Sequence, residues 1–165
     1  MNDIYLPNTL ISSDSQVIPM TRKKVLFICK NNSGRSQMAE GLLRRIYGDQ
    51  YEVSSAGSDP KGVNPLTIEI MEEIGIDISD HASQHLNEFQ GQEFDYVVTL
   101  CGDGSEDENG ESCPIFLGGK KYIHHGFKDP ATYKDSNLEK NEIFRLIRDE
   151  IKEWIEKEFE NPDRL

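Results

Sequence analysis

The stretch VLFICKNNSGRS, residues 25–36, decides the fold of this chain. It opens with strand-forming apolar residues, reaches a cysteine, continues through small and polar residues, and ends in an arginine and a serine. We predict a buried strand over residues 24–28 and a helix over residues 36–47, in which apolar side chains recur at helical spacing. The loop between strand and helix is then a cradle for a tetrahedral oxyanion, with the Cys29 thiol beneath it.

Each residue type in this loop suits an anion site. The N-terminus of the helix and the backbone amides of the loop favour the thiolate of Cys29, and the guanidinium of Arg35 can bind two oxygens of an arsenate or phosphate. Gly34 permits a tight turn or a positive φ, Asn32 tolerates left-handed geometry, and Ser36 can donate a hydrogen bond to the thiolate. The alternative without a binding site is a buried cysteine at a strand end with an unrelated surface arginine. The predicted strand before the loop and the predicted helix after it favour the anion site. The predicted oxyanion-binding residues are Lys30, Asn31, Asn32, Ser33, Gly34 and Arg35.

The composition limits the kinds of partner. At 165 residues the chain is predicted to form one domain with a proper core. Its net charge of −12 argues against nucleic acid or an anionic membrane as a partner. No apolar run approaches the length of a membrane span, and the first twenty residues lack the basic start and apolar centre of a secretion signal. We therefore predict a cytoplasmic protein whose three cysteines serve catalysis or redox chemistry.

Strand and helix patterns alternate along the chain. Beyond the first strand and helix, we predict strands over residues 51–56, 96–100 and 122–125, and helices over residues 65–74, 83–90 and 138–159. This alternation predicts an α/β fold: a single domain with a parallel four-stranded sheet and helices on both faces. The predicted domain covers residues 23–160, between a flexible N-terminal extension of residues 1–22 and a C-terminal tail of residues 161–165.

Two further cysteines lie downstream. Cys101 directly follows the third predicted strand, as Cys29 follows the first, and ligands of open α/β sheets bind at these carboxyl ends. If the two strands are neighbours, both thiols open on one crevice, and Cys113 lies beyond an acidic loop that can fold toward them. Cys101 and Cys113 are thus candidate resolving thiols; the alternatives are a buried apolar cysteine and an incidental loop thiol. A zinc site that joins them to His124 and His125 fits no common spacing, so we predict no metal site of this kind.

A set of short segments carries a family resemblance. The matching segments are residues 29–41, 55–57, 75–79, 97–103, 113–114 and 126–131. On these segments, from about residue 24 to residue 159, the chain resembles the thioredoxin-coupled arsenate reductases, which have the low-molecular-weight protein tyrosine phosphatase fold. The resemblance covers nearly all of the chain beyond the N-terminal extension.

The resemblance implies a role for each site residue. Cys29 attacks arsenate, Arg35 and the loop amides hold its oxygens, and Asp129 is the general acid that protonates the leaving oxygen. Cys101 then attacks the adduct, arsenite leaves, and a Cys29–Cys101 disulfide forms as an intermediate. Cys113 attacks Cys101, which gives a final Cys101–Cys113 disulfide that thioredoxin, or alternatively glutaredoxin, reduces. Such an enzyme would serve arsenic detoxification.

The alternative function is that of a low-molecular-weight protein tyrosine phosphatase, which hydrolyses phosphate monoesters through a phosphoenzyme at Cys29. Arg35 and Asp129 would serve it equally well. Phosphatases of this fold usually carry an aromatic residue just after the Asp-Pro pair, whereas Ala131 and Thr132 follow here. They also need no relay of three cysteines, so both features favour the reductase.

The resemblance also bears on cofactors. Some members of the family bind potassium near the loop, and Asn32, Glu40 and Ser55 match that site. Gln84 stands where such members carry an aspartate. We therefore predict no tightly bound cofactor and at most a weak potassium site.

Overall fold

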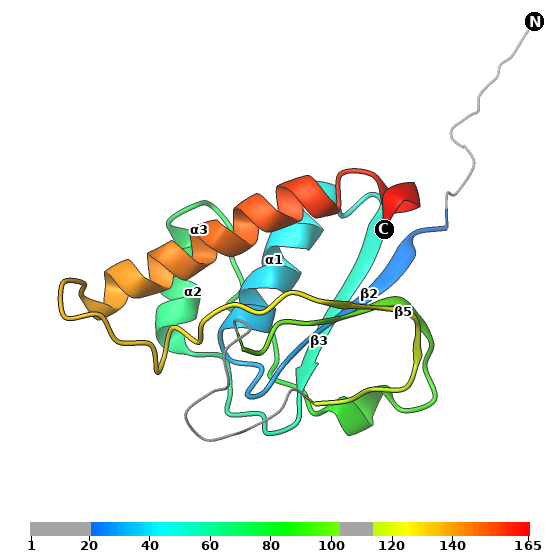
Figure 1. The fold of residues 1–165 in the computed structure, drawn as a ribbon, viewed down its shortest axis with the longest axis horizontal. Helices are drawn as coiled ribbons and strands as arrows, with labels where there is room; N and C mark the ends of the chain where they lie inside the picture. The colour runs from blue at the N-terminus through cyan, green and yellow to red at the C-terminus, as the bar shows by residue number, and fades with distance from the viewer. Residues whose placement is uncertain (1–20, 103–113) are drawn as a thin grey trace, which may run out of the picture.

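The structure is a computed structural model that describes residues 21–102 and 114–165. In this part of the chain, four parallel strands form one sheet in the order β3-β2-β4-β5 (Figure 1). The strands are β2 (Lys23–Cys29), β3 (Tyr51–Gly57), β4 (Phe94–Thr99) and β5 (Gly119–His124). The predicted fold class is confirmed, and each predicted strand is present with ends that differ by three residues or fewer.

The helices divide unequally between the two faces of the sheet. The α-helices are α1 (Arg35–Tyr47), α2 (Pro65–Glu72) and α3 (Lys140–Glu158), and the short 3-10 helices are η2 (Leu86–Phe89) and η3 (Pro162–Arg164). All three α-helices share one core with one face of the sheet, whereas η2 packs on the opposite face. The segment predicted as a helix over residues 83–90 is therefore a single 3-10 turn. α2 ends earlier than predicted, and the chain turns at Gly75 with a φ of 79°.

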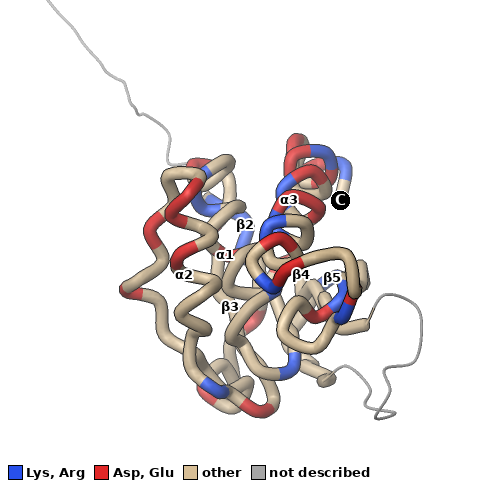
Figure 2. The backbone as a smooth tube through the Cα atoms, turned by 90° about the vertical axis from the view of Figure 1, so that its left-hand side faces the viewer, with Lys and Arg blue, Asp and Glu red and all other residues tan. Residues whose placement is uncertain are grey.

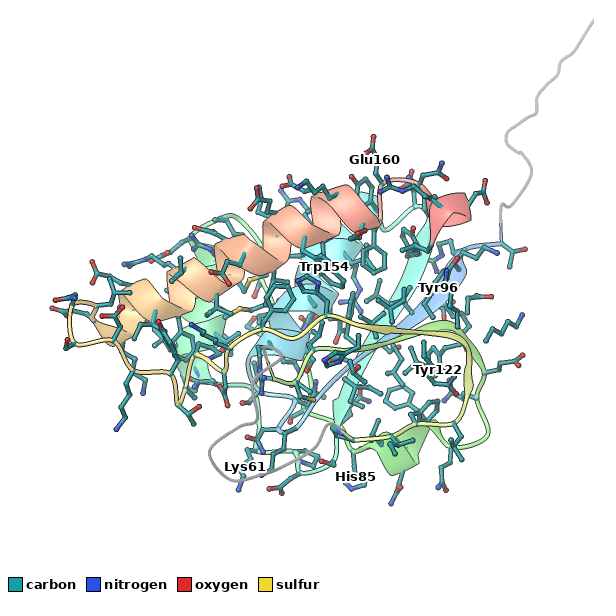
Figure 3. All side chains as sticks on the ribbon, viewed as in Figure 1. Lys61, His85, Tyr96, Tyr122, Trp154 and Glu160 are labelled. Atoms are coloured by element: carbon teal, nitrogen blue, oxygen red, sulfur yellow. The ribbon has the colours of Figure 1, made fainter. Side chains whose placement is uncertain are left out.

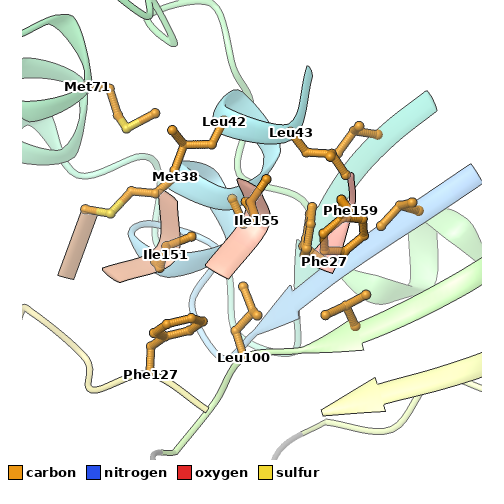
Figure 4. Packing of buried hydrophobic residues seen from close by; sticks show 14 of the residues in the cluster. Phe27, Met38, Leu42, Leu43, Met71, Leu100, Phe127, Ile151, Ile155 and Phe159 are labelled. Carbon is orange, nitrogen blue, oxygen red and sulfur yellow. The ribbon is translucent and has the colours of Figure 1, made fainter. Parts of the chain in front are cut away.

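The alternation of side chains along β2 explains why its sequence is apolar without a break. Val25 and Phe27 face the α-helices, whereas Leu26 and Ile28 face η2. A strand buried on both faces reads as a continuous apolar run. The buried side chains form two core clusters, one on each face of the sheet. Figure 4 shows the larger one, on the face of the α-helices, in which Phe27 packs below residues of α1 and α3.

A charged network joins α2 to α3. α2 and the residue that follows it carry only acidic charges, while acidic and basic residues alternate along α3 (Figure 2). Glu73 accepts hydrogen bonds from Arg145 Nε at 2.9 Å and from Arg148 Nη1 at 3.0 Å. Arg148 also donates to the carbonyl of Ile70. The hydrogen bonds from Arg145 and then Arg148 hold the pKa of Glu73 at about 2.

Tyrosine hydroxyls of β3 and β4 bind the backbone at the end of α3 and in η3. Tyr51 donates to the carbonyl of Phe159 at 3.0 Å. Tyr96, labelled in Figure 3, donates to the carbonyl of Pro162 at 2.9 Å. Burial raises the pKa of Tyr51, so its hydroxyl stays a donor. Residues 161–165, predicted as a tail, include η3, and Leu165 packs against the larger core cluster. In the two described ranges, no helix combines the length and the apolar character needed to cross a membrane.

Candidate active site

Cys29 lies at the carboxyl end of β2, below the start of α1. Its thiol is free and only 2% of the residue is exposed. The Sγ atom lies 2.9 Å from the Oγ atom of Ser36 in the first turn of α1. This helix begins at Arg35, one residue earlier than predicted, and no side chain caps it at Gly34. The amide groups of its first turn are therefore directed at the loop without a side-chain acceptor of their own.

The carbonyl groups of the loop are bound on its outer side. The amide of Asp59 donates to Lys30 O at 2.9 Å, that of Lys61 donates to Asn31 O at 3.1 Å, and that of Asn64 donates to Ser33 O at 3.1 Å. A carbonyl and the next amide of a trans peptide point in opposite directions. The amides that follow these carbonyls are thus turned away from residues 59–64, as an anion cradle requires.

The segment of residues 59–64 was not among the predicted site residues. Its only signal in the sequence is the Ser-Ala-Gly triplet just before it, residues 55–57. A Cβ atom at Gly57 would collide with the carbonyl oxygen of Lys30 and lie 2.8 Å from that of Cys29. Gly57 is therefore what allows β3 and the following segment to approach the loop this closely.

Asn32 braces the loop from within. It is fully buried and has a φ of 47°, so the left-handed residue of the loop is Asn32, whereas Gly34 has a φ of −130°. The Nδ2 group donates to Ser36 Oγ at 2.7 Å and to Ser55 Oγ at 2.9 Å. Each of its two hydrogens thus has a hydroxyl acceptor.

The oxygen of the same amide is also bound. Asn32 Oδ1 accepts hydrogen bonds from the backbone amide of Gln84 at 2.8 Å and from Gln37 Nε2 at 3.1 Å. These donors fix which way the amide of Asn32 faces. Gln84 therefore holds the loop through its backbone, a contact that its side-chain type does not reveal.

Arg35 connects the loop to the predicted general acid. Its guanidinium is buried, donates from Nη1 to the carbonyl of Phe127 at 3.0 Å, and has Nη2 at 3.7 Å from Asp129 Oδ2. The other carboxylate oxygen, Asp129 Oδ1, accepts from the amide of Ala131 at 2.9 Å, which orients the carboxylate. The structure thus brings the Asp-Pro segment, far away in the sequence, against the start of α1.

Cys101 lies beside the strand that carries Cys29. β2 and β4 are neighbours, as the shared crevice requires, and the amide of Leu100 donates to Ile28 O at 2.8 Å. The Sγ atom of Cys101 lies 4.0 Å from that same carbonyl oxygen. Cys101 is two residues beyond the end of β4 rather than directly after it, because the strand ends at Thr99. Cys113 lies outside the described residues.

The residues of the predicted potassium site form a chain of hydrogen bonds. Ser55 accepts from Asn32 and donates to Glu40 Oε1 at 2.5 Å, and Glu40 Oε2 accepts from Arg44 Nη2 at 2.6 Å. The side-chain oxygens that a cation would need are thus engaged, and Asn32 turns its amino group toward Ser55. In this arrangement the three residues do not fit a potassium ion. Within residues 21–102 and 114–165, no three His, Cys, Asp or Glu side chains are grouped as metal ligands.

Comparison with known proteins gives the family. The family model of the low molecular weight phosphotyrosine protein phosphatases matches residues 24–162. An arsenate reductase of Staphylococcus epidermidis is 46% identical over 137 residues, which cover 83% of this chain and 96% of the relative. A solved structure of an arsenate reductase in the phosphate binding state has a TM-score of 0.65 and 34% identity, with 81% of this chain and 94% of that chain covered. The thioredoxin-dependent arsenate reductase of Corynebacterium glutamicum has a TM-score of 0.57 and 33% identity, with 87% and 66% covered. The chain therefore belongs to the low molecular weight phosphotyrosine protein phosphatase family, and it is similar to arsenate reductases over most of their length.

Proposed function

We propose that this protein reduces arsenate to arsenite with Cys29 as the nucleophile. The observation that carries the proposal is the free, buried thiol of Cys29, which lies 2.9 Å from Ser36 Oγ at the start of α1. The similar proteins are named arsenate reductases, which indicates arsenate as the substrate. Arsenate is a tetrahedral oxyanion of the size that the loop and the guanidinium of Arg35 suit.

The first step forms a covalent adduct. The Cys29 thiolate attacks arsenic, one arsenate oxygen leaves as water, and a sulfur–arsenic bond takes its place. Asp129 gives the proton to the leaving oxygen. The support for this role is the position of its carboxylate, 3.7 Å from Arg35 Nη2, on the loop that reaches the start of α1. A water-excluded nucleophile and a nearby acid are what such a displacement needs.

The second step reduces arsenic. The Cys101 thiolate attacks Cys29 Sγ, the sulfur–arsenic bond breaks, and its electron pair stays on arsenic, which leaves as arsenite. The two thiols lose two electrons and become a Cys29–Cys101 disulfide, while arsenic passes from the +5 to the +3 state. The support is the location of Cys101 Sγ, 4.0 Å from the carbonyl of Ile28, the residue before Cys29.

The third step regenerates the nucleophile. The Cys113 thiolate attacks Cys101, which frees Cys29 and leaves a Cys101–Cys113 disulfide for thioredoxin to reduce. The relative from Corynebacterium glutamicum is named thioredoxin-dependent, which favours thioredoxin over glutaredoxin. A thiol relay that thioredoxin regenerates requires a reducing compartment, so we propose that the protein lies in the cytoplasm.

A second activity follows from the family. Cys29, Arg35 and Asp129 would serve hydrolysis of a phosphate monoester as well, and the matching family model is that of phosphatases. Water would then attack a phosphorylated Cys29, with no part for Cys101 or Cys113. We propose this only as a weak side activity, because it leaves the second cysteine beside β2 unused.

The test combines three variants in two assays. Arsenite production is followed with thioredoxin, thioredoxin reductase and NADPH, and aryl phosphate hydrolysis is followed in parallel. We expect continuous turnover for the wild type, one arsenite per chain for Cys113→Ser, none for Cys101→Ser, and neither activity for Cys29→Ser. Brisk aryl phosphate hydrolysis by the wild type without arsenite production would show that the protein is a phosphatase instead.

We further propose that catalysis needs no bound cofactor and no potassium ion. The guanidinium of Arg44 already pairs with Glu40 at 2.6 Å. The charge of Glu40 is thus balanced from within the protein.

A further inference from the structure

Asp129, the proposed general acid, lies on a segment of irregular backbone. Residues 125–129 follow β5 and belong to no helix or strand of the described chain. The amides of His125 and Phe127 donate at 3.0 Å to carbonyls at and just after the end of β4. The backbone hydrogen bonds of Asp129 itself are local, to the amides of residues 131–133. Its position at the anion site therefore depends on how the segment before it is held.

Aromatic side chains hold this segment from the side of α3. The ring of Trp154 on α3 stacks on that of His125, with centroids 4.9 Å apart and planes inclined by 22° (Figure 3). It also meets the ring of Phe127 edge-on at 5.7 Å, and the rings of His125 and Phe127 lie 4.7 Å apart. Trp154 in turn packs against the larger core cluster and meets Phe159 edge-on at 5.4 Å. We call His125, Phe127 and Trp154 the aromatic clamp.

Phe127 links the aromatic clamp to the anion site. Its ring packs on Trp154, while its carbonyl accepts a hydrogen bond from Arg35 Nη1 at 3.0 Å. Asp129 lies two residues further along, with Oδ2 3.7 Å from Arg35 Nη2. The segment is thus held between α3 on one side and the guanidinium on the other. A catalytic group needs this kind of support, because its geometry is only as precise as the packing behind it.

His125 is the exposed member of the aromatic clamp. Phe127 is buried in the larger core cluster and Trp154 packs against it, so both also stabilise the fold. The side chain of His125 lies at the surface, where a substitution usually has little effect on stability. Partial burial lowers the pKa of its ring, an effect that Glu158 opposes and His124 supports. The ring is therefore mostly neutral at pH 7 and stacks on Trp154 as an aromatic group.

We propose that His125 is a positioning residue for the general acid. Its stack on Trp154 keeps the segment in place, so that Asp129 reaches the leaving oxygen. This inference rests on the proposed function, because it requires Asp129 to act as the acid in the first step. Loss of the stack leaves Arg35 and the Cys29 loop intact, so arsenate should still bind. Proton transfer should become slower, since an acid must lie within hydrogen-bond reach of the oxygen that it protonates.

The variant His125→Ala tests this role, with His124→Ala as the matched control. His124 is the adjacent exposed imidazole, and its Nδ1 lies 2.8 Å from Thr99 Oγ1. Arsenite release is measured by rapid quench of the pre-reduced protein at increasing arsenate concentrations. We expect the maximal rate of His125→Ala to fall roughly three- to tenfold, and the arsenate concentration at half that rate to stay within about twofold of the wild-type value. His124→Ala should match the wild type.

A conservative variant tests whether stacking is the cause. His125→Phe keeps an aromatic ring at this position and should regain most of the lost rate. If it is as slow as His125→Ala, the stack is not what holds the segment, and the proposal is wrong. Trp154 is the single tryptophan of the chain, so its fluorescence reports on the same contact. Its emission should move to longer wavelength in His125→Ala but not in His124→Ala, and an unchanged emission would show that the two rings do not stack.

A double-mutant cycle separates positioning from a general loss of structure. In an Asp129→Asn background, His125→Ala should cause no further loss of rate, because the group that it positions is already gone. An equal loss in both backgrounds would show that His125 acts elsewhere. A normal rate in His125→Ala beside a slow Asp129→Asn would overturn the positioning role and leave the proposed function intact. A normal rate in Asp129→Asn would overturn the acid role and the positioning role together, and no arsenite release by the wild type would overturn the proposed function itself.

Discussion

The hydroxyl of Ser36 lies 2.9 Å from the sulfur of Cys29, and when that sulfur is a thiolate only the hydroxyl can donate across this contact. The amino group of Asn32 can only donate, and it lies 2.7 Å from the same hydroxyl oxygen. Ser36 therefore accepts from Asn32, and its own hydrogen is available to the sulfur. A donor fixed in this direction stabilises the thiolate more than the thiol.

Replacement of Ser36 should slow the first chemical step. Ser36→Ala removes the donor to the thiolate, and a hydrogen bond to a charged group contributes about 1.5–3 kcal/mol. We expect the rate of arsenite release in a single turnover to fall roughly ten- to hundredfold. The rate is measured by rapid quench of the pre-reduced protein, with the exposed Ser58→Ala as the control. A wild-type rate in Ser36→Ala would show that the bond does not activate the nucleophile.

Two glycines next to the loop should differ in their tolerance of a methyl group. A Cβ atom at Gly57 would collide with the backbone of residues 29–30, whereas at Gly34 it would lie 3.8 Å from Pro130 Cγ and 3.9 Å from Thr67 Oγ1. Overpacking against backbone typically costs about 1–3 kcal/mol. We expect Gly57→Ala to lower the free energy of unfolding in urea by at least this amount, and Gly34→Ala to leave it nearly unchanged. The reverse order would contradict the close approach of β3 to the loop.

The sequence was sufficient for the elements whose pattern is local. The apolar run before Cys29 and the helical spacing after it reveal β2 and α1, and parallel pairing follows from the alternation of strands and helices. The contacts that shape the loop are not local. The left-handed φ of Asn32 and the hydrogen bonds from residues 59–64 depend on which segments the fold brings to the end of β2. The backbone amide of Gln84 donates whatever side chain the residue carries, so its residue type does not reveal this contact. Cys113, which the prediction places in the relay, lies outside the described ranges.

The link between α2 and α3 should depend on pH in the acid range. Arg145 and Arg148 hold the pKa of Glu73 at about 2, below the value of about 4.3 in an unfolded chain. The ionised carboxylate thus favours the folded state; its contribution is complete above the unfolded pKa and is lost as the pH falls through about 2.

The variant Glu73→Gln should therefore lower the Tm at pH 7, and the difference from the wild type should shrink as the pH falls from about 4 toward 2. Thermal unfolding followed by circular dichroism measures it. The adjacent Glu72→Gln makes the same change in charge outside the network and should show no such trend. A Tm difference that is constant down to the acid limit would show that Glu73 acts by packing instead of charge.

The pairing of Arg44 with Glu40 should make the enzyme indifferent to potassium. Both carboxylate oxygens of Glu40 are occupied, one by Ser55 and one by Arg44. We expect equal turnover in KCl and NaCl at the same ionic strength.

Arg44→Met leaves the Glu40 carboxylate, whose side chain is 12% exposed, without this partner. Its rate should fall, since Glu40 reaches the nucleophile through Ser55, Asn32 and Ser36. Potassium should restore part of that rate. Arg45→Met, which removes an arginine that donates to the carbonyl of Gly75, is the matched control and should respond to neither salt. A severalfold stimulation of the wild type by KCl would mean that Arg44 yields its place to the ion and that the site binds potassium after all.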